Sequence, residues 1–276
     1  MRHLKQMTYY LTQNPCYKAG KKIRVQGLML HSVGCPQPRA EVFLKSWNRT
    51  DYGRACVHAF IDGNDGMVYQ TLPWEYRGWH CGGKGNDTHI GVEICEPAAI
   101  RYSSGTRFTC TDLTSARSSV RKTYEAAVDL FAGLCKKYGL DPMAGGVILS
   151  HCEGHLRGIA SNHGDPEHLW KGLGMSYTMD GFRQEVKQRM ETLDGQKSET
   201  ETKPGKGTAV PYRVRVTISN LNIRRGPGTN YARTGRYTGV GVFTIVEEAE
   251  GKGASKWGKL KSQAGWISLD YTRKAA

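Results

Sequence analysis

Residues 146–170, GVILSHCEGHLRGIASNHGDPEHLW, decide how the fold of this chain is interpreted. The apolar run GVILS has the length of a buried strand and leads into His151. His151 and His155 have the spacing of the metal-binding motif His-Glu-x-x-His, but the glutamate stands one position too late, which on a helix turns it by about 100°. Gly154 and Gly158 each disfavour a helix by about 1 kcal/mol. We therefore predict a strand that ends in a histidine, and no helical metal motif.

The second half of this stretch, NHGDP, holds a histidine and an aspartate separated by one residue. In an extended segment, His163 and Asp165 face the same side. Pro166 restricts the residue before it to extended conformations, which would hold the Asp165 carboxylate in place. One member of this pair can bind a metal while the other reaches a substrate.

A matching histidine, His31, ends another apolar run, IRVQGLML. A catalytic zinc ion needs three protein ligands and one open position for water, whose pKa it lowers to about 7. His31 and His151 supply two ligands, and His155, His163 and Asp165 are candidates for the third. Two imidazoles and a carboxylate also suit non-haem iron, so ligand type alone does not select the metal.

Strand and helix patterns alternate along the first two thirds of the chain. Residues 118–140 have apolar side chains at helical spacing and end in Lys-Lys-x-Gly, which predicts an amphipathic helix, and residues 177–193 predict a last helix. Strands are predicted at 23–30, 57–62, 66–73, 88–95 and 146–151, with a hairpin around the turn GNDG. This order predicts an α/β domain with a mixed central sheet and flanking helices.

Residues 191–211, ETLDGQKSETETKPGKGTAVP, have the composition of a solvated linker. They would separate a domain of residues 1–190 from a tail of residues 212–276. The tail has short β-branched and aromatic runs between Gly-rich turns and no helical period, which predicts a small all-β barrel or sandwich. Its 12 Lys+Arg against 4 Asp+Glu give it a charge of +8 out of the chain's +14.

The composition fits a globular protein of 276 residues, 38% hydrophobic and 23% charged, with no run of ~20 apolar residues that could span a membrane. The N-terminus lacks the apolar segment of a secretory signal, so we expect synthesis in the cytoplasm. The net charge of +14 predicts attraction to polyanions, but its spread along the chain argues against nucleic acid. Without an export signal or a CxxC pair, the eight cysteines are expected to be reduced.

The order of the motifs resembles the zinc-dependent N-acetylmuramoyl-L-alanine amidases, whose fold is shared with the peptidoglycan-recognition proteins. The resemblance rests on His31 after an apolar strand, on WHCGGKGNDTHIGVEICEP at 79–97, and on His151 followed by an Asp-Pro pair. It covers roughly residues 20–190. The resemblance implies an enzyme that hydrolyses an amide bond in bacterial peptidoglycan.

Carried over to this chain, the resemblance implies that one catalytic Zn²⁺ is bound by His31, His151 and Asp165. It implies that Glu93, in IGVEI, positions or deprotonates the metal-bound water. Many members have a lysine two residues before the last ligand, where this chain has His163. A protonated imidazole could replace that lysine in stabilising the oxyanion, but only over part of the pH range. Amide hydrolysis needs such a nucleophile, proton carrier and stabiliser.

The resemblance also implies substrate contacts. His80, preceded by Trp79, matches a position that lines the substrate groove, and His58 falls where some members have a catalytic tyrosine. For both histidines, an ordinary hydrogen-bonded role agrees equally well with the sequence. Cys152 is an alternative nucleophile, which would make the protein a zinc-independent peptidase.

Residues 221–271 closely resemble a bacterial SH3 domain of type 3. The pattern Leu-Asn-Ile-Arg-x-Gly-Pro-Gly-Thr is followed by Trp-Gly-Lys-Leu and Gly-Trp-Ile. Such domains bind the cell wall in many peptidoglycan hydrolases; a domain that packs on the body without a ligand is the alternative. We expect one of Trp257 and Trp266 in the core and the other partly exposed. Candidate aromatic platform residues are Tyr231, Tyr237 and Tyr271.

These features together predict a phage- or prophage-type endolysin that cleaves the amide between N-acetylmuramic acid and L-alanine of the stem peptide. Such an enzyme would be released from the cytoplasm by a membrane-permeabilising, holin-type partner. A bacterial autolysin and a non-catalytic peptidoglycan-binding protein of the same fold are the alternatives.

Overall fold

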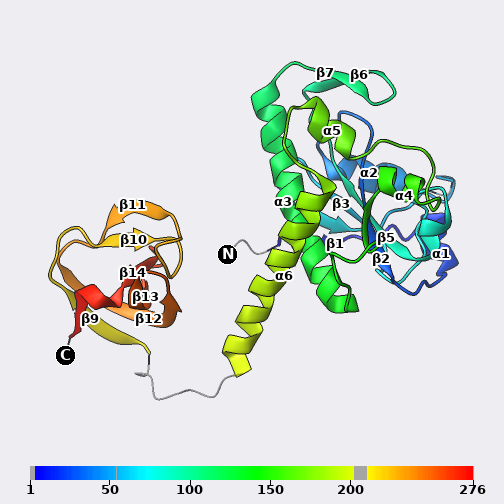
Figure 1. Cartoon of the computed structure of the whole chain (residues 1–276). Coiled ribbons are helices and arrows are strands. Elements are labelled where there is room, and N and C mark those ends of the chain that lie inside the picture. The colour runs from blue at the N-terminus through cyan, green and yellow to red at the C-terminus, as the bar shows by residue number, and fades with distance from the viewer. Residues whose placement is uncertain (1–3, 54, 202–209, 276) are drawn as a thin grey trace. The chain divides into compact units, whose positions relative to one another are not determined.

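The computed structural model describes residues 4–53, 55–201 and 210–275. The chain divides into two compact units, Met1–Thr200 and Glu201–Ala276 (Figure 1). No helix in the described ranges is long and apolar enough to cross a membrane.

A mixed six-stranded sheet forms the centre of the first unit, in the order β1-β4-β3-β5-β2-β8. Its neighbouring strands pair in parallel, except for the antiparallel hairpin of β3 and β4. The hairpin and the mixed sheet confirm the predicted α/β architecture. The strands are β1 (Gln6–Thr8), β2 (Gly27–Ser32), β3 (Ala59–Ile61), β4 (Val68–Gln70), β5 (His89–Ile94) and β8 (Ile148–Ser150).

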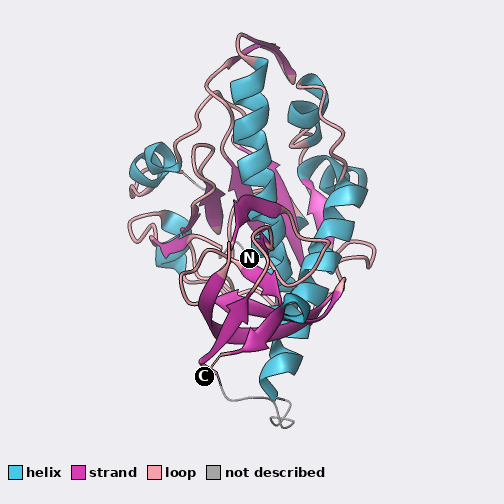
Figure 2. Ribbon diagram, turned by 90° about the vertical axis from the view of Figure 1, so that its left-hand side faces the viewer, coloured by secondary structure: helices cyan, strands magenta, loops and turns pink. Residues whose placement is uncertain are grey.

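Helices cover both faces of this sheet (Figure 2). The larger core lies between one face and three helices, which are α3 (Leu113–Tyr138), α5 (Glu167–Gly172) and α6 (Met179–Glu201). Figure 1 shows α3 and α6 side by side along this face. A smaller core on the other face includes α1 (Pro15–Ala19) and α2 (Ala40–Trp47).

The twofold alternation of side chains along the strands decides which residues can form a site. In β2, Leu28 and Leu30 enter the larger core, so Met29 and His31 face the opposite side. In β5, Val92 enters the same core, and its neighbour Glu93 faces the opposite side. The first unit therefore directs its polar strand residues to the face that α3 and α6 leave free.

The expectation that residues 151–156 would not be helical is wrong, because they form α4 (His151–Leu156). Ser150 and Glu153 make a capping box: the Ser150 hydroxyl accepts a bond from the Glu153 amide, and the Glu153 carboxylate accepts one from the Ser150 amide. Such caps typically stabilise a helix by about 1 kcal/mol, which offsets the glycine at position 154. His151 is therefore the first residue of a helix that directly follows β8.

The predicted last helix is longer than expected. As α6, it continues past residue 190 to Glu201, so the first part of the segment expected as a linker, 191–211, is helical. The rest of that segment, up to residue 209, lies outside the described residues. The sequence did not predict several short elements, which include β1, α1, α2 and α5, the hairpin of β6 (Ile100–Ser104) and β7 (Arg107–Cys110), and the short helix η1 (Lys84–Asp87).

The second unit is β-rich, as predicted for the tail. Its seven-stranded sheet has the order β11-β10-β14-β13-β12-β9-β15 and encloses a core that includes Val214, Ile245 and Ile267. Trp257 and Trp266 are both buried, so the expectation of one partly exposed tryptophan is wrong. The strands are β9 (Tyr212–Val216), β10 (Asn222–Arg224), β11 (Arg233–Tyr237), β12 (Gly241–Gly251), β13 (Ala254–Leu260), β14 (Trp266–Ser268) and β15 (Thr272–Lys274), with η2 (Leu269–Tyr271) before the last.

Candidate metal centre

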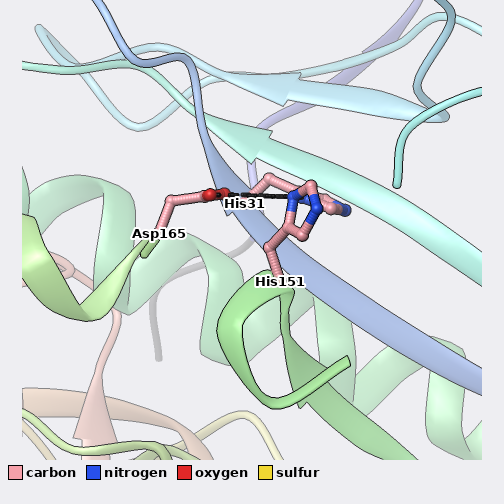
Figure 3. A group of neighbouring side chains, drawn as sticks. All are labelled: His31, His151 and Asp165. Atoms are coloured by element: carbon pink, nitrogen blue, oxygen red, sulfur yellow. Dashed lines mark hydrogen bonds and ion pairs between the residues drawn. The ribbon is translucent and has the colours of Figure 1, made fainter. Parts of the chain in front are cut away.

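Three buried side chains from distant parts of the sequence converge at one end of β2 (Figure 3). His31 comes from β2, His151 from the first turn of α4, and Asp165 from the loop before α5. The two Nδ1 atoms of the histidines lie 3.0 Å apart. Asp165 Oδ2 lies 3.5 Å from His31 Nδ1, and Asp165 Oδ1 lies 3.6 Å from His151 Nδ1.

This geometry fits a tetrahedral zinc ion. Ligand atoms placed about 2.0–2.1 Å from such an ion are about 3.3 Å from one another, within the span of the observed separations. The ligand atoms of all three residues lie within 4.8 Å of one another. Two imidazole nitrogens and a carboxylate oxygen leave the fourth position open, as in catalytic zinc sites. The three residues can therefore hold the ion that the sequence predicted.

The carboxylate of Asp165 has a charge state that suits the binding of a cation. Burial favours its neutral form, but a hydrogen bond from His31, the charges of His31 and His151, and the Ser32 amide together lower its pKa below the usual value. The Ser32 amide donates to Oδ2 over 3.2 Å. Asp165 is therefore ionised at neutral pH and offers a negatively charged ligand.

Glu93 stands beside the metal centre. In the parallel pairing of β5 with β2, Glu93 is the direct partner of His31. Burial, followed by the charges of Asp165 and Glu96, raises its pKa well above the ordinary value. Its Oε2 atom is buried and has no hydrogen-bond partner among the described residues. A buried carboxyl group with a raised pKa beside a metal centre is suited to accept and return a proton.

The cluster lies at a groove of about 700 Å³. His163 is exposed at its edge, and its Nδ1 lies 3.1 Å from Ser161 Oγ and 3.2 Å from His151 Nε2. The structure thus places Glu93 and His163, the two predicted catalytic residues, on the same groove as the metal cluster. The other lining residues are Ser32, Val33, Gly34, His80, Tyr102, Gly105, Thr106, His151, Asn162, Gly164, Asp165 and His168.

The predicted substrate contacts have different positions. His80 lines the groove, but its ring is anchored by hydrogen bonds to protein atoms. His58 is completely buried: its Nδ1 accepts a bond from the Gly91 amide, and its Nε2 donates to the Tyr76 carbonyl. Burial is the largest cause that lowers its pKa to about 4. Both ring nitrogens of His58 are therefore used inside the protein, so the structure offers no support for its predicted contact with substrate, which stays a prediction.

Trp79 is partly buried and is not among the residues that line the groove. The Arg77 guanidinium lies over its ring, 5.0 Å from the centroid. In its backbone, the Trp79 amide bonds to the Cys56 carbonyl over 2.8 Å. The structure gives Trp79 a packing role and offers no support for substrate contact.

Two alternatives left open by the sequence lose their support. His155 is exposed and does not join the metal-ligand cluster. Cys152 does not line the groove, and burial, followed by the charges of Glu167, Glu153 and Asp165, raises its pKa. A raised pKa disfavours the thiolate that a nucleophile needs.

Sequence reasoning missed one polar network at the groove. The Tyr102 hydroxyl donates to Glu96 over 2.8 Å and lies 2.7 Å from His168 Nε2. Glu96 is completely buried, which raises its pKa to about 7, although Ser32, Tyr102 and Gly34 hydrogen bond to it. The sequence signal was the glutamate in the apolar segment IGVEICEP, three residues after Glu93.

The sequence of the first unit matches a known protein family. Residues 21–168 match the family model of N-acetylmuramoyl-L-alanine amidase. Over 264 residues the chain is 23% identical to the bifunctional autolysin of Staphylococcus aureus, covering 90% of this chain and 19% of that protein. The chain thus spans about a fifth of the length of the curated relatives that it matches.

One solved structure shows the same fold. The crystal structure of Staphylococcus aureus hydrolase AmiA in complex with its ligand matches with a TM-score of 0.54 and 21% identity, over 71% of this chain and 87% of that one. A mutant endolysin from Bacillus subtilis matches with a TM-score of 0.46 and 18% identity, over 67% of this chain and 99% of that one. Because the family model spans more than half of the sequence, the chain belongs to the N-acetylmuramoyl-L-alanine amidase family.

Proposed function

We propose that this protein is a zinc-dependent peptidoglycan hydrolase that cleaves the amide between N-acetylmuramic acid and the L-alanine of the stem peptide. The observation that carries the proposal is the convergence of His31, His151 and Asp165 at a groove that also holds Glu93. A protein that only binds peptidoglycan has no need of three metal ligands beside a carboxyl group with a raised pKa.

Each polar residue of the groove has its own role in the reaction. A bound zinc ion would supply the Lewis acidity that activates water and polarises the amide carbonyl. Glu93 accepts the proton of the attacking water and returns it to the leaving amine nitrogen. His163 faces the charge that develops on the carbonyl oxygen, because its Nδ1 is occupied inward and its Nε2 has no partner in the described part of the chain. A donor of this kind commonly contributes 100- to 1,000-fold in rate.

We further propose that the tail is an SH3-like module that anchors the enzyme to the cell wall. In β9, exposed Arg213 and Arg215 alternate with buried valines, and Arg273 of β15 lies directly opposite Arg215. None of the three arginines has an ion-pair partner among the residues the structure describes. Like charges placed directly opposite destabilise a sheet, and an anionic wall polymer would relieve this repulsion. Anchoring raises the effective concentration of the enzyme at its substrate.

Mass spectrometry of digested cell walls tests the proposed activity. We expect fragments with a free L-alanine amine and an intact glycan, no cleavage after treatment with a chelator, and recovery on addition of Zn²⁺. New reducing sugar ends would make the protein a glycosidase, and cleavage that persists without metal would exclude the zinc site from the reaction. Binding to walls without any cleavage would support the non-catalytic alternative. An endolysin and a bacterial autolysin give the same products, so the proposal covers both.

A further inference from the structure

The ring of His80 is held in a single orientation beside the metal centre. Its backbone amide donates to Asn86 Oδ1 over 2.8 Å, which fixes the main chain. The ring lies against Gly91 of β5, where any Cβ atom would overlap it. Its Nε2 lies 3.0 Å from the backbone carbonyl oxygen of His89, and its Nδ1 lies 2.9 Å from His31 Nε2. Both ring nitrogens of His80 are therefore used within the protein.

These contacts fix the position of each proton. A carbonyl oxygen can only accept, so His80 Nε2 must carry a proton and donate it to His89. In a neutral imidazole the other nitrogen is then an acceptor, so His80 Nδ1 receives the proton of His31 Nε2. When His31 is neutral, as a metal ligand must be, its lone pair is therefore on Nδ1; the hydrogen bond and charge that it gives Asp165 belong to its doubly protonated form. Nδ1 is the nitrogen that faces His151 and Asp165.

We infer that His80 is a positioning residue, which sets the tautomer and ring orientation of His31 so that Nδ1 is presented to the metal. Neutral imidazole exists in two tautomers, and only the one with a bare Nδ1 can bind metal here. The partner of a ligand's other nitrogen also raises its basicity. The inference rests on the proposed metal site, and it assigns to His80 a role other than contact with substrate.

The second histidine ligand is supported in a looser way. His151 Nε2 lies 3.1 Å from Ser161 Oγ and 3.2 Å from His163 Nδ1. Ser161 is half-buried and His163 is exposed, so either partner can rearrange when substrate enters. His80, by contrast, is held to the backbone of β5. The metal centre thus has one ligand with a rigid support and one that faces the groove.

Two substitutions of His80, by side chains of equal size, distinguish a role in hydrogen bonding to His31 from a role in packing. In His80→Asn, Oδ1 stands at the same number of bonds from Cα as Nδ1 and can accept the His31 proton. His80→Leu has the same shape and no acceptor. His155→Leu is the matched control, because His155 is exposed and outside the metal cluster. Circular dichroism checks that each variant is folded.

Two measurements on the full chain do not depend on catalysis. In the metal-free protein at a pH high enough for the imidazoles to be neutral, ¹⁵N NMR should show His31 protonated on Nε2 in the wild type and in His80→Asn, and as a mixture of tautomers in His80→Leu. In competition with a chelator, His80→Leu should bind Zn²⁺ about 10- to 100-fold more weakly than the wild type, while His80→Asn and His155→Leu stay close to it.

The inference would be overturned if His31 kept the same tautomer in His80→Leu, or if Asn and Leu weakened Zn²⁺ binding equally. If His80→Asn fails to fold, His80→Gln replaces it, because its Oε1 can also accept the His31 proton. The wild type alone can also refute the inference, if its neutral His31 carries the proton on Nδ1. The proposed amidase activity fails separately: inactive wild-type protein with the expected tautomer and Zn²⁺ affinity would remove the activity and leave the role of His80 intact.

Discussion

The substitution Glu93→Gln tests the proposed proton carrier most directly. It keeps the shape of the side chain and removes its ability to take up a proton. Glu93 is the strand partner of His31 and is not one of the three metal-ligating residues, so the variant should still bind zinc. Loss of general-base catalysis typically costs 100- to 10,000-fold in rate, or about 3–5 kcal/mol of transition-state stabilisation.

The structure also predicts an effect of this substitution on stability. Burial, followed by Asp165 and Glu96, raises the pKa of Glu93 in the folded state, whereas in the unfolded chain it stays near 4.5. A carboxyl group with a raised folded pKa destabilises the fold as the pH rises above the unfolded value, because only the unfolded state loses its proton freely. Metal-free Glu93→Gln should therefore melt at a higher temperature than wild type at pH 7–8, and the difference should shrink towards pH 4.

Kinetics on purified walls, zinc content and calorimetric melting curves provide the readouts. Glu185→Gln is a suitable control, since Glu185 accepts a hydrogen bond from Tyr124 within the α3–α6 region and does not line the groove. Full activity of Glu93→Gln would remove this residue from the mechanism. A variant that lost both zinc and activity would show that Glu93 supports the metal centre instead of carrying a proton.

Three further predictions follow from residues outside the metal cluster. Burial lowers the pKa of His58 to about 4 in the folded state, against an ordinary 6.5, so its protonation favours the unfolded state. The free energy of unfolding should therefore fall by about 2 kcal/mol between pH 8 and pH 5. Urea titrations should show a smaller fall in His58→Asn, and an equal fall would contradict the lowered pKa of His58. Cys152→Ser should keep full activity in the wall assay, and a large loss would revive the thiol mechanism. Arg215→Gln combined with Arg273→Gln should reduce sedimentation with purified walls at low salt and flatten its salt dependence, whereas unchanged sedimentation would locate wall binding elsewhere.

Much of the fold follows from local patterns in the sequence. The helical spacing of residues 118–140 predicted α3, and the structure places its ends by the Asp112 cap and by Gly139 in the left-handed conformation, with a φ of 63°. Apolar runs predicted the central strands, since a strand buried on both faces has no polar positions to interrupt it. The short elements were not predictable: the hairpin of β6 and β7 owes its position to contacts such as Phe108 against Gly172.

By itself the sequence determined which side chains could form the centre. His31 and His151 end apolar runs, and these patterns leave His155, His163 and Asp165 as candidates for the third ligand. The choice of Asp165 and the role of Glu93 come from the resemblance to the amidases. Ligand chemistry and strand alternation are local properties, so they can be inferred from the order of residues.

Only the tertiary structure decided what the remaining histidines do. Nothing local distinguishes His80, which bonds to His31, from His58, which is buried between Tyr76 and Gly91, or from His155, which is exposed. The capping of α4 by Ser150 likewise overrode the low helix propensity of its glycine. The role of an imidazole is set by the atoms that meet its two nitrogens, and these come from distant segments that only folding brings together.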